Sequence, residues 1–363
     1  MKYVVTIACF FIGLGQNIAQ PDIRPGSYSI PDSIAVKVKY RDDLTRLSKD
    51  LTATLPQPIE KVRSIYRWIT HNIAYDYKFI NKEREVVWPD CDDKPNCKEI
   101  RLEFEKNLAQ KTASKKKGTA EGFAYLFKRL CTDAGVTCEV VKGGVRTKPY
   151  QAGNNTPINH FWNAVYIGKD WYFIDAMLSA GIIKENEETG KLMPFERKEN
   201  DVYFLSPYEQ FRKDHCPEKA NWQAILGIQN REKFNRQPFY YNAANYVSTV
   251  SGLSPDTGFL NTRVGDTIQF SFNYPFTIDR IQVNTNLKQN PKIVYYDKKK
   301  QQEINMYALK RQVYWPYEKE GTRYTFRVPI TDRSLYYIDI LFKYPSDIDA
   351  TKVLRYRVNI PWN

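Results

Sequence analysis

Two residues in the middle of the chain have types and spacing suited to acid–base chemistry. His160 opens an apolar, strand-like run, and Asp175 lies near the end of a second such run. Gly168 to Asp170 between them predict a hairpin turn, so the runs should form an antiparallel pair. In such a pair the two side chains can approach each other. A histidine oriented by a carboxylate is the base of a thiol-protease-type triad.

The nucleophile of such a triad is missing from its expected place. Residues 115–141 predict a loop, a core helix and a core strand, with Thr119 as the N-cap of the helix and Gly135 at its end. A helix N-terminus carries free N–H groups and a partial positive charge, so it can hold a thiolate. The first-turn residues are Ala120 and Glu121, which offer no thiol. The alternative is a helix that serves only to pack the core.

The helix and the two strands together resemble a known family. The pattern is similar to that of the transglutaminase-like superfamily, in particular its kyphoscoliosis-peptidase-like secreted bacterial branch. The resemblance implies a papain-like core and peptidase or acyl-transfer chemistry on glutamine or peptide carbonyls. The matching residues are Lys117, Gly118, Gly122, Phe123, Leu126, Phe127, Leu130, Cys131, Ala134, Gly135, His160, Trp162, Asn163, Ala164, Val165, Trp171, Tyr172, Ile174, Asp175, Ala180 and Gly181.

The departures from this pattern concern the reacting groups. The family's catalytic cysteine falls on Ala120, and its Thr-Trp-Gly segment falls on residues 177–179, which read Met-Leu-Ser. Alanine has no nucleophilic atom, so the covalent thioester route is closed. His160 and Asp175 are retained. Several departures around one site favour a natural loss of catalysis.

Three functions remain open at this stage. We favour a catalytically inactive protein that binds peptide or glycopeptide in a vestigial Cys–His–Asp cleft. A second possibility is an active hydrolase with rerouted chemistry, in which Thr119 or Glu121 acts with His160 through an activated water. A third is an adhesive or structural surface protein that binds through its C-terminal domain and its charge. The residues expected at the cleft are Ala120, Glu121, His160, Trp162 and Asp175.

Length and hydropathy patterning predict two domains of the α+β class. A chain of 363 residues suits two domains, and its 42% hydrophobic content excludes a mainly disordered protein. Residues 20–235 are assigned to the transglutaminase-like, papain-like domain. Residues 246–363 alternate polar and apolar positions and predict an antiparallel, immunoglobulin-like β-sandwich. No binding site can be identified within this sandwich.

The N-terminus and the net charge suggest an exported protein with anionic partners. Residues 1–19 have a charged Lys2, an apolar stretch and a small Ala19, the pattern of a signal peptide. The expected location is secreted, periplasmic or at the cell surface, with no transmembrane segment. A formal charge of +13 favours anionic cell-surface material, and export argues against a nucleic-acid role.

The cysteines and histidines suggest disulfide chemistry and no cofactor. Cys91 and Cys97 bracket a turn-rich loop suited to a local disulfide. Cys131 and Cys138 can either pair or serve as small buried hydrophobes, and Cys216 is left over as a structural cysteine. The three histidines are scattered, so we expect no metal and no other cofactor.

The remaining segments carry weaker signals. Residues 20–35 are expected to be extended, residues 36–52 to form one helix, and residues 77–111 to form a charged, turn-rich insertion. The family resemblance implies an upstream tryptophan that helps to stabilise an oxyanion, and it is open whether Trp88 takes that place. His215 is expected to be structural.

Overall fold

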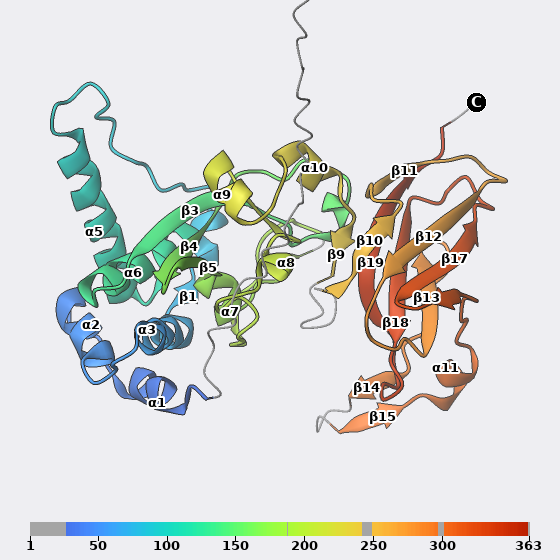
Figure 1. The fold of residues 1–363 in the computed structure, drawn as a ribbon, viewed down its shortest axis with the longest axis horizontal. Helices are drawn as coiled ribbons and strands as arrows, with labels where there is room; N and C mark the ends of the chain where they lie inside the picture. The colour runs from blue at the N-terminus through green and yellow to red at the C-terminus, as the bar shows by residue number, and fades with distance from the viewer. Residues whose placement is uncertain (1–26, 187, 242–248, 297–300, 362–363) are drawn as a thin grey trace, which may run out of the picture.

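The computed structural model describes residues 27–186, 188–241, 249–296 and 301–361. The predicted signal peptide at residues 1–19 lies outside these residues. The described chain has helices around a four-stranded sheet in its first part and two further sheets, of four and five strands, in its second part, as Figure 1 shows. This is the α+β arrangement expected from the sequence. Among the described residues, no helix is both long enough and apolar enough to span a membrane.

The helices lie almost entirely in the first part of the chain. The early helices differ from the prediction, because residues 29–37 are helical rather than extended and residues 38–43 interrupt the single helix expected over 36–52. The helices are α1 (Ser29–Lys37), α2 (Leu44–Thr52), α3 (Pro58–Asn72), α4 (Tyr77–Ile80), α5 (Cys97–Lys115), α6 (Ala120–Asp133), α7 (Ala176–Ala180), α8 (Tyr208–Phe211), α9 (Ala220–Ile225), α10 (Arg231–Arg236) and α11 (Met306–Lys310), with a 3-10 helix at Pro149–Gln151.

A four-stranded antiparallel sheet with the order β5-β4-β3-β8 carries the candidate site. The hairpin expected around Gly168 is present, with this glycine in the left-handed region at a φ of 68°. Helix α6 packs against β3 and β4. The strands of this first part are β1 (Ala74–Tyr75), β2 (Lys117–Gly118), β3 (Cys138–Val145), β4 (His160–Ile167), β5 (Asp170–Ile174), β6 (Gly181–Ile182), β7 (Glu196–Arg197), β8 (His215–Pro217) and β9 (Phe239–Tyr240).

Helix α5 is the main element that the sequence did not predict. It is a helix of 19 residues that begins inside the turn-rich insertion expected over residues 77–111 and extends to Lys115, and it buries only Ala109, Thr112 and Ala113. So few buried positions leave almost no helical period in the sequence, which explains the wrong assignment. Figure 1 shows α5 extending away from the sheet, with the loop of residues 81–96 leading to its far end, where the helix begins.

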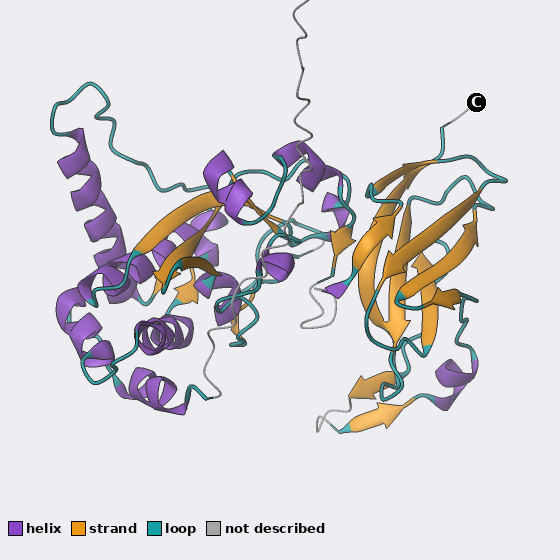
Figure 2. Cartoon of the chain, viewed as in Figure 1, coloured by secondary structure: helices purple, strands orange, loops and turns teal. Residues whose placement is uncertain are grey.

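The second part of the chain forms the expected two-sheet sandwich, which Figure 2 shows as a strand-rich unit. One sheet has the order β10-β12-β17-β16, and the other has the order β11-β19-β18-β13 with β9 also paired to β19. The pairing is antiparallel except for β11, which runs parallel to β19. The strands are β10 (Ser251–Ser254), β11 (Phe259–Asn261), β12 (Thr267–Asn273), β13 (Arg280–Thr285), β14 (Val294–Tyr296), β15 (Gln302–Ile304), β16 (Glu318–Glu320), β17 (Arg323–Pro329), β18 (Tyr337–Lys343) and β19 (Thr351–Asn359).

Close contact between α5 and the start of α6 fixes the position of the candidate site. A Cβ added at Gly122 would lie 2.6 Å from Thr112 Oγ1. Thr112 is buried, and its hydroxyl donates a hydrogen bond to the Leu108 carbonyl at 2.9 Å. The threonine therefore cannot swing away without losing this bond.

Substitution at this contact should lower stability. Alanine is normally favoured over glycine in a helix by about 1 kcal/mol. We expect Gly122→Ala instead to lower the free energy of unfolding by about 1–3 kcal/mol, because the new methyl group overpacks the contact with Thr112. In a Thr112→Ala background the same change should become neutral or stabilising. Urea denaturation of the four proteins measures both effects, and equal effects of Gly122→Ala in the two backgrounds would contradict the predicted contact.

Candidate functional site

The start of helix α6 and the start of strand β4 lie at the same end of the first domain. Cys138, just after α6, pairs with Val165 near the far end of β4, so the C-terminus of α6 lies away from His160. The Asn163 amide donates a hydrogen bond to the Ala124 carbonyl at 2.9 Å. From this contact, Ala120 lies four residues back along α6, a rise of about 6 Å, and His160 lies three residues back along β4, a rise of about 10 Å. Both steps lead toward the same edge of the sheet, so the first turn of α6 and His160 lie at that edge.

His160 and Asp175, predicted as partners from the sequence, are in direct contact. His160 Nε2 lies 2.5 Å from Asp175 Oδ2. A carboxylate only accepts, so Nε2 donates this bond. The other oxygen of Asp175 accepts a hydrogen bond from the Leu178 backbone N–H at 2.9 Å and caps helix α7.

A second histidine, interpreted as structural from the sequence alone, also contacts the carboxylate. His215 Nε2 lies 3.2 Å from the same Asp175 oxygen, and its Nδ1 lies 2.5 Å from Asp214 Oδ1. Tyr203 donates a hydrogen bond to the other oxygen of Asp214 at 2.5 Å. The result is a continuous chain of hydrogen bonds from His160 to Tyr203. Its only sequence signal was the Asp-His pair at 214–215, 40 residues from Asp175.

Within this series of hydrogen bonds, the neighbouring charges keep Asp175 and His215 charged. Burial by itself raises the pKa of Asp175, but the charge of His160 and the hydrogen bonds from both histidines outweigh it, so the pKa is lowered. Burial by itself lowers the pKa of His215, but the charge of Asp214 and the hydrogen bonds to Asp175 and Asp214 raise it to about 9. At neutral pH a buried carboxylate therefore lies next to a buried imidazolium.

The same three side chains are types that bind metal ions. The ligand atoms of His160, Asp175 and His215 lie within 4.8 Å of one another. However, the 2.5 Å between His160 Nε2 and Asp175 Oδ2 is a hydrogen-bond distance. Two ligands that each lie about 2.1 Å from one ion are normally about 3 Å or more apart. The geometry fits proton-sharing better than metal binding, and the expectation that the chain holds no metal stays a prediction.

Glu121 and Trp88, two further candidates, contact each other. The Trp88 indole N–H donates to Glu121 Oε1 at 2.6 Å, and its ring packs on Phe104 and Tyr125. Burial raises the pKa of Glu121, opposed by this hydrogen bond and by the charge of Lys142. Both polar groups are thus engaged in fixing the loop against α6. Thr119 is engaged as well, because its hydroxyl caps the Gly122 N–H at 3.4 Å, as predicted.

Trp162 lies behind the histidines. It is 1% exposed, and its ring meets His215 edge-on with the centroids 5.0 Å apart. A Cβ at Gly143 would lie 2.4 Å from the Trp162 ring, so only glycine allows this backbone approach. Trp162 therefore supports the His215 ring, and its contact with a ligand stays a prediction.

A cavity of about 850 Å³ opens beside His160. Its lining combines apolar and polar side chains and draws on several segments of the chain. Ala120 is buried and does not line it, although it belongs to the same core cluster as Met177, which does. The lining residues used below are Tyr75, Lys148, Tyr150, His160, Met177 and Leu178.

The described cysteines offer no replacement nucleophile. Cys91 and Cys97 form the expected local disulfide, with an S–S distance of 2.07 Å. Cys131, Cys138 and Cys216 are free and buried. Of the two alternatives for Cys131 and Cys138, the structure therefore agrees with small buried core residues and not with a disulfide between them. Burial raises the pKa of the Cys216 thiol to about 11, which disfavours the reactive thiolate.

Comparison with known families agrees with this geometry. Residues 45–176 match the model of the transglutaminase-like superfamily. The match covers α2, α3, α5 and α6 together with the β3-β4-β5 sheet, and it ends just after Asp175.

Three curated proteins illustrate the similarity. The chain is 28% identical to kyphoscoliosis peptidase of Mus musculus over 237 residues, which are 64% of this chain and 32% of that protein. It is 28% identical to hillarin of Drosophila melanogaster over 225 residues, covering 59% of this chain and 25% of the relative. It is 25% identical to cytokinesis protein 3 of Saccharomyces cerevisiae over 228 residues, which are 59% of this chain and 23% of that protein. The chain thus spans a third or less of the length of these relatives, and the finer assignment to a secreted bacterial branch stays a prediction.

The buried histidine should make stability depend on pH. His215 has a folded-state pKa of about 9 against an ordinary value of 6.5, so its contribution is fully present below about pH 6.5 and is lost as the pH rises through 9. We expect the free energy of unfolding to fall across this window by an amount on the order of 3 kcal/mol. Urea denaturation at a series of pH values measures the fall.

Two variants assign this effect to its source. His215→Gln should remove the decrease, and Asp214→Asn should reduce it. His71→Gln should leave it intact, because His71 is an exposed histidine paired with Glu199. A wild-type stability that stays flat between pH 6.5 and 9 would contradict a charged His215.

Proposed function

Since residues 45–176 belong to the transglutaminase-like superfamily, we propose that the protein is a non-catalytic member that binds peptide or glycopeptide at its vestigial Cys–His–Asp cleft. The observation that carries the proposal is a retained His160–Asp175 couple beside a helix that begins with Ala120. A methyl group cannot attack a carbonyl carbon, so the acyl-enzyme route is closed. The rest of the site is a binding surface.

The cavity beside His160 supports peptide binding. At about 850 Å³ it lies within the usual range of ligand pockets. Tyr75, Tyr150 and Leu178 provide flat or apolar surfaces for side chains, and Lys148 and the imidazole provide polar contacts. Such a mixture suits a peptide segment, in which polar amides alternate with apolar groups.

The names of relatives point to the same class of ligand. The mouse and human relatives are named as peptidases, which concerns those proteins. A peptidase site must first bind a peptide chain, and binding groups can persist where the nucleophile is lost. For this chain we therefore propose the binding without the cleavage.

The proposal extends to the location of the protein. The N-terminal sequence pattern supports export to the cell envelope or exterior, and the charge of +13 supports contact with anionic surface material. The C-terminal sandwich would serve as a spacer or as a second binding module. Recovery of the tagged protein in cell fractions tests the location directly.

One observation favours a second candidate, a hydrolase that acts through an activated water. The intact histidine–carboxylate couple can still accept a proton. Against this candidate, Glu121 is bonded to Trp88 and Thr119 caps the helix, so neither is free to act on a substrate. Casein hydrolysis that disappears in His160→Ala would favour this candidate over the non-catalytic one.

Restoring the thiol tests the vestigial cleft. In Ala120→Cys we expect the new thiol to react with iodoacetamide at pH 6 at least tenfold faster than the native cysteines, because the imidazole and the helix N-terminus both favour a thiolate. Mass spectrometry of the modified peptide measures the rate. The double variant Ala120→Cys/His160→Ala should lose this faster reaction with iodoacetamide. An equal rate of modification in the two variants would contradict the inference that the side chain of residue 120 faces the His160 imidazole.

Peptide binding at the cavity can be measured with fluorescein-labelled dimethylcasein. We expect Tyr150→Ala to weaken its binding about fivefold, because this tyrosine lines the cavity and is 66% exposed. Tyr336→Ala is the matched control, since Tyr336 is 62% exposed and lies in the sandwich part. Anisotropy titrations give both dissociation constants. Equal losses in the two variants, or no binding by the wild type, would contradict peptide binding at this cavity.

A further inference from the structure

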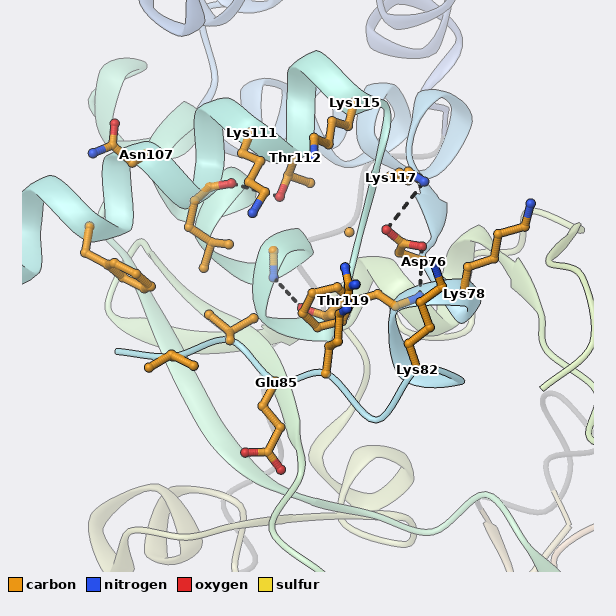
Figure 3. A pocket seen from close by; sticks show the side chains of 18 residues that line it. Asp76, Lys78, Lys82, Glu85, Asn107, Lys111, Thr112, Lys115, Lys117 and Thr119 are labelled. Carbon is orange, nitrogen blue, oxygen red and sulfur yellow. Dashed lines mark hydrogen bonds and ion pairs between the residues drawn. The ribbon is translucent and has the colours of Figure 1, made fainter. Parts of the chain in front are cut away.

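A second cavity, of about 620 Å³, lies between helix α5, the loop after α4 and the start of α6. Figure 3 shows it from close by, with Lys111 and Lys115 on the α5 side and Lys117 near Asp76. It is separate from the cavity at His160, but consecutive residues at the end of strand β1 line the two. Tyr75 lines the first cavity and the next residue, Asp76, lines the second.

The charge of this second cavity is strongly unbalanced. Six basic side chains line it against two acidic ones, Asp76 and Glu85. Asp76 is already engaged, because it lies 3.6 Å from Lys117 Nζ and also caps the Phe79 N–H. In Figure 3 the Glu85 carboxylate points away from the lysines of α5. The basic residues are Lys78, Lys82, Arg84, Lys111, Lys115 and Lys117.

Most of these cations lack a counter-charge. Within the described part of the chain, no carboxylate lies within ion-pair distance of Lys82, Arg84, Lys111 or Lys115. Cations gathered around one hollow repel each other, and the positive end of the α6 dipole adds to the same field. An anionic ligand would relieve this repulsion.

The cavity also has apolar surface that is open to solvent. Val87 is 80% exposed, and Phe79, Phe104 and Leu108 are only partly buried. The neighbouring Trp88 holds this loop in place through its hydrogen bond to Glu121 and its packing on Phe104. The apolar groups thus belong to an anchored wall, and they offer a place for an apolar side chain of a ligand.

We propose that this second cavity binds an acidic segment of polypeptide, with carboxylates facing the lysines and an apolar side chain against the Val87 wall. It deepens the proposed function, and rests on it for the ligand class, by giving the chemistry of the peptide that reaches the cleft. Thr119 and Gly122 line this cavity and flank Ala120 in the first turn of α6. A chain that crosses strand β1 would therefore enter both cavities.

Charge and shape favour an acidic peptide over a phosphate group. Phosphate sites concentrate arginine forks or backbone N–H groups on one point. Here five of the six cations are lysines, and they come from α4, α5, β2 and the intervening loop. Separated charges around an apolar wall match several carboxylates on one chain better than one compact dianion.

The test uses the full chain and a fluorescein-labelled peptide of alternating glutamate and leucine. We expect Lys82→Glu/Lys111→Glu to weaken its binding at least tenfold, because both residues line the cavity. Lys49→Glu/Lys98→Glu makes the same change of net charge on exposed helical lysines that do not line it, and should change affinity less than twofold. Anisotropy at low and high salt measures the dissociation constants, and binding should weaken with salt.

Two further probes make the result decisive. A peptide with glutamine in place of glutamate should bind at least tenfold more weakly; equal binding would overturn the proposal. Inorganic phosphate and phosphatidylserine vesicles should not displace the acidic peptide when the ionic strength is held constant. Displacement that depends on Lys82 and Lys111 would overturn it in favour of a phosphate ligand.

The two proposals fail separately. If Tyr150→Ala weakens dimethylcasein binding while Lys82→Glu/Lys111→Glu binds the acidic peptide like the wild type, peptide binding at the His160 cavity is supported. Binding of an acidic segment at the second cavity is then contradicted. If Lys82→Glu/Lys111→Glu loses binding of the acidic peptide while Tyr150→Ala has no effect on dimethylcasein binding, binding of an acidic segment at the second cavity is supported. Peptide binding at the His160 cavity is then contradicted.

Discussion

The buried carboxylate of Asp175 is the constraint on which the rest of the site depends. It is 0% exposed, and its two oxygens accept hydrogen bonds from His160, His215 and the Leu178 backbone. A buried charge is costly unless it is paired and hydrogen-bonded. The strand β4, the strand β8 and the start of α7 must therefore stay where they are, and the His160 ring is held whether or not a nucleophile faces it. This accounts for the close contact between His160 and Asp175.

The start of α6 is fixed by equally strict contacts. The close approach of Gly122 to Thr112 sets the distance to α5, and the Asn163 amide ties the helix to β4. Trp88 then links the loop of the insertion to Glu121 in the first turn. Residues that would be catalytic candidates in isolation are instead parts of this framework. Two cavities open to solvent around this framework. One lies at His160 and the other is lined by lysines, and the consecutive residues Tyr75 and Asp76 line the first and the second of them.

Much of this arrangement could be predicted from the sequence. The periodic run of α6, the hairpin at Gly168 and the alternating strands of the sandwich carry strong local patterns, and each is present. The partnership of His160 and Asp175 followed from the hairpin and the family resemblance. The elements that were missed have weak patterns. Helix α5 buries three residues, and α1 is a short helix that buries only Pro31 and Ala35. A helix without a buried face leaves little period to detect.

The sequence by itself determined which groups are present: an alanine at the start of α6, a histidine at the start of one strand, an aspartate just after the next strand, and an excess of basic over acidic residues. Only the tertiary structure decided what surrounds them. It brought His215 into contact with Asp175 from 40 residues away, and it buried Trp162 in the core. It also placed lysines from α4, the loop after α4, α5 and β2 around one cavity. Local patterns report each residue's own element, whereas burial, pKa and counter-charge depend on neighbours that are distant along the chain.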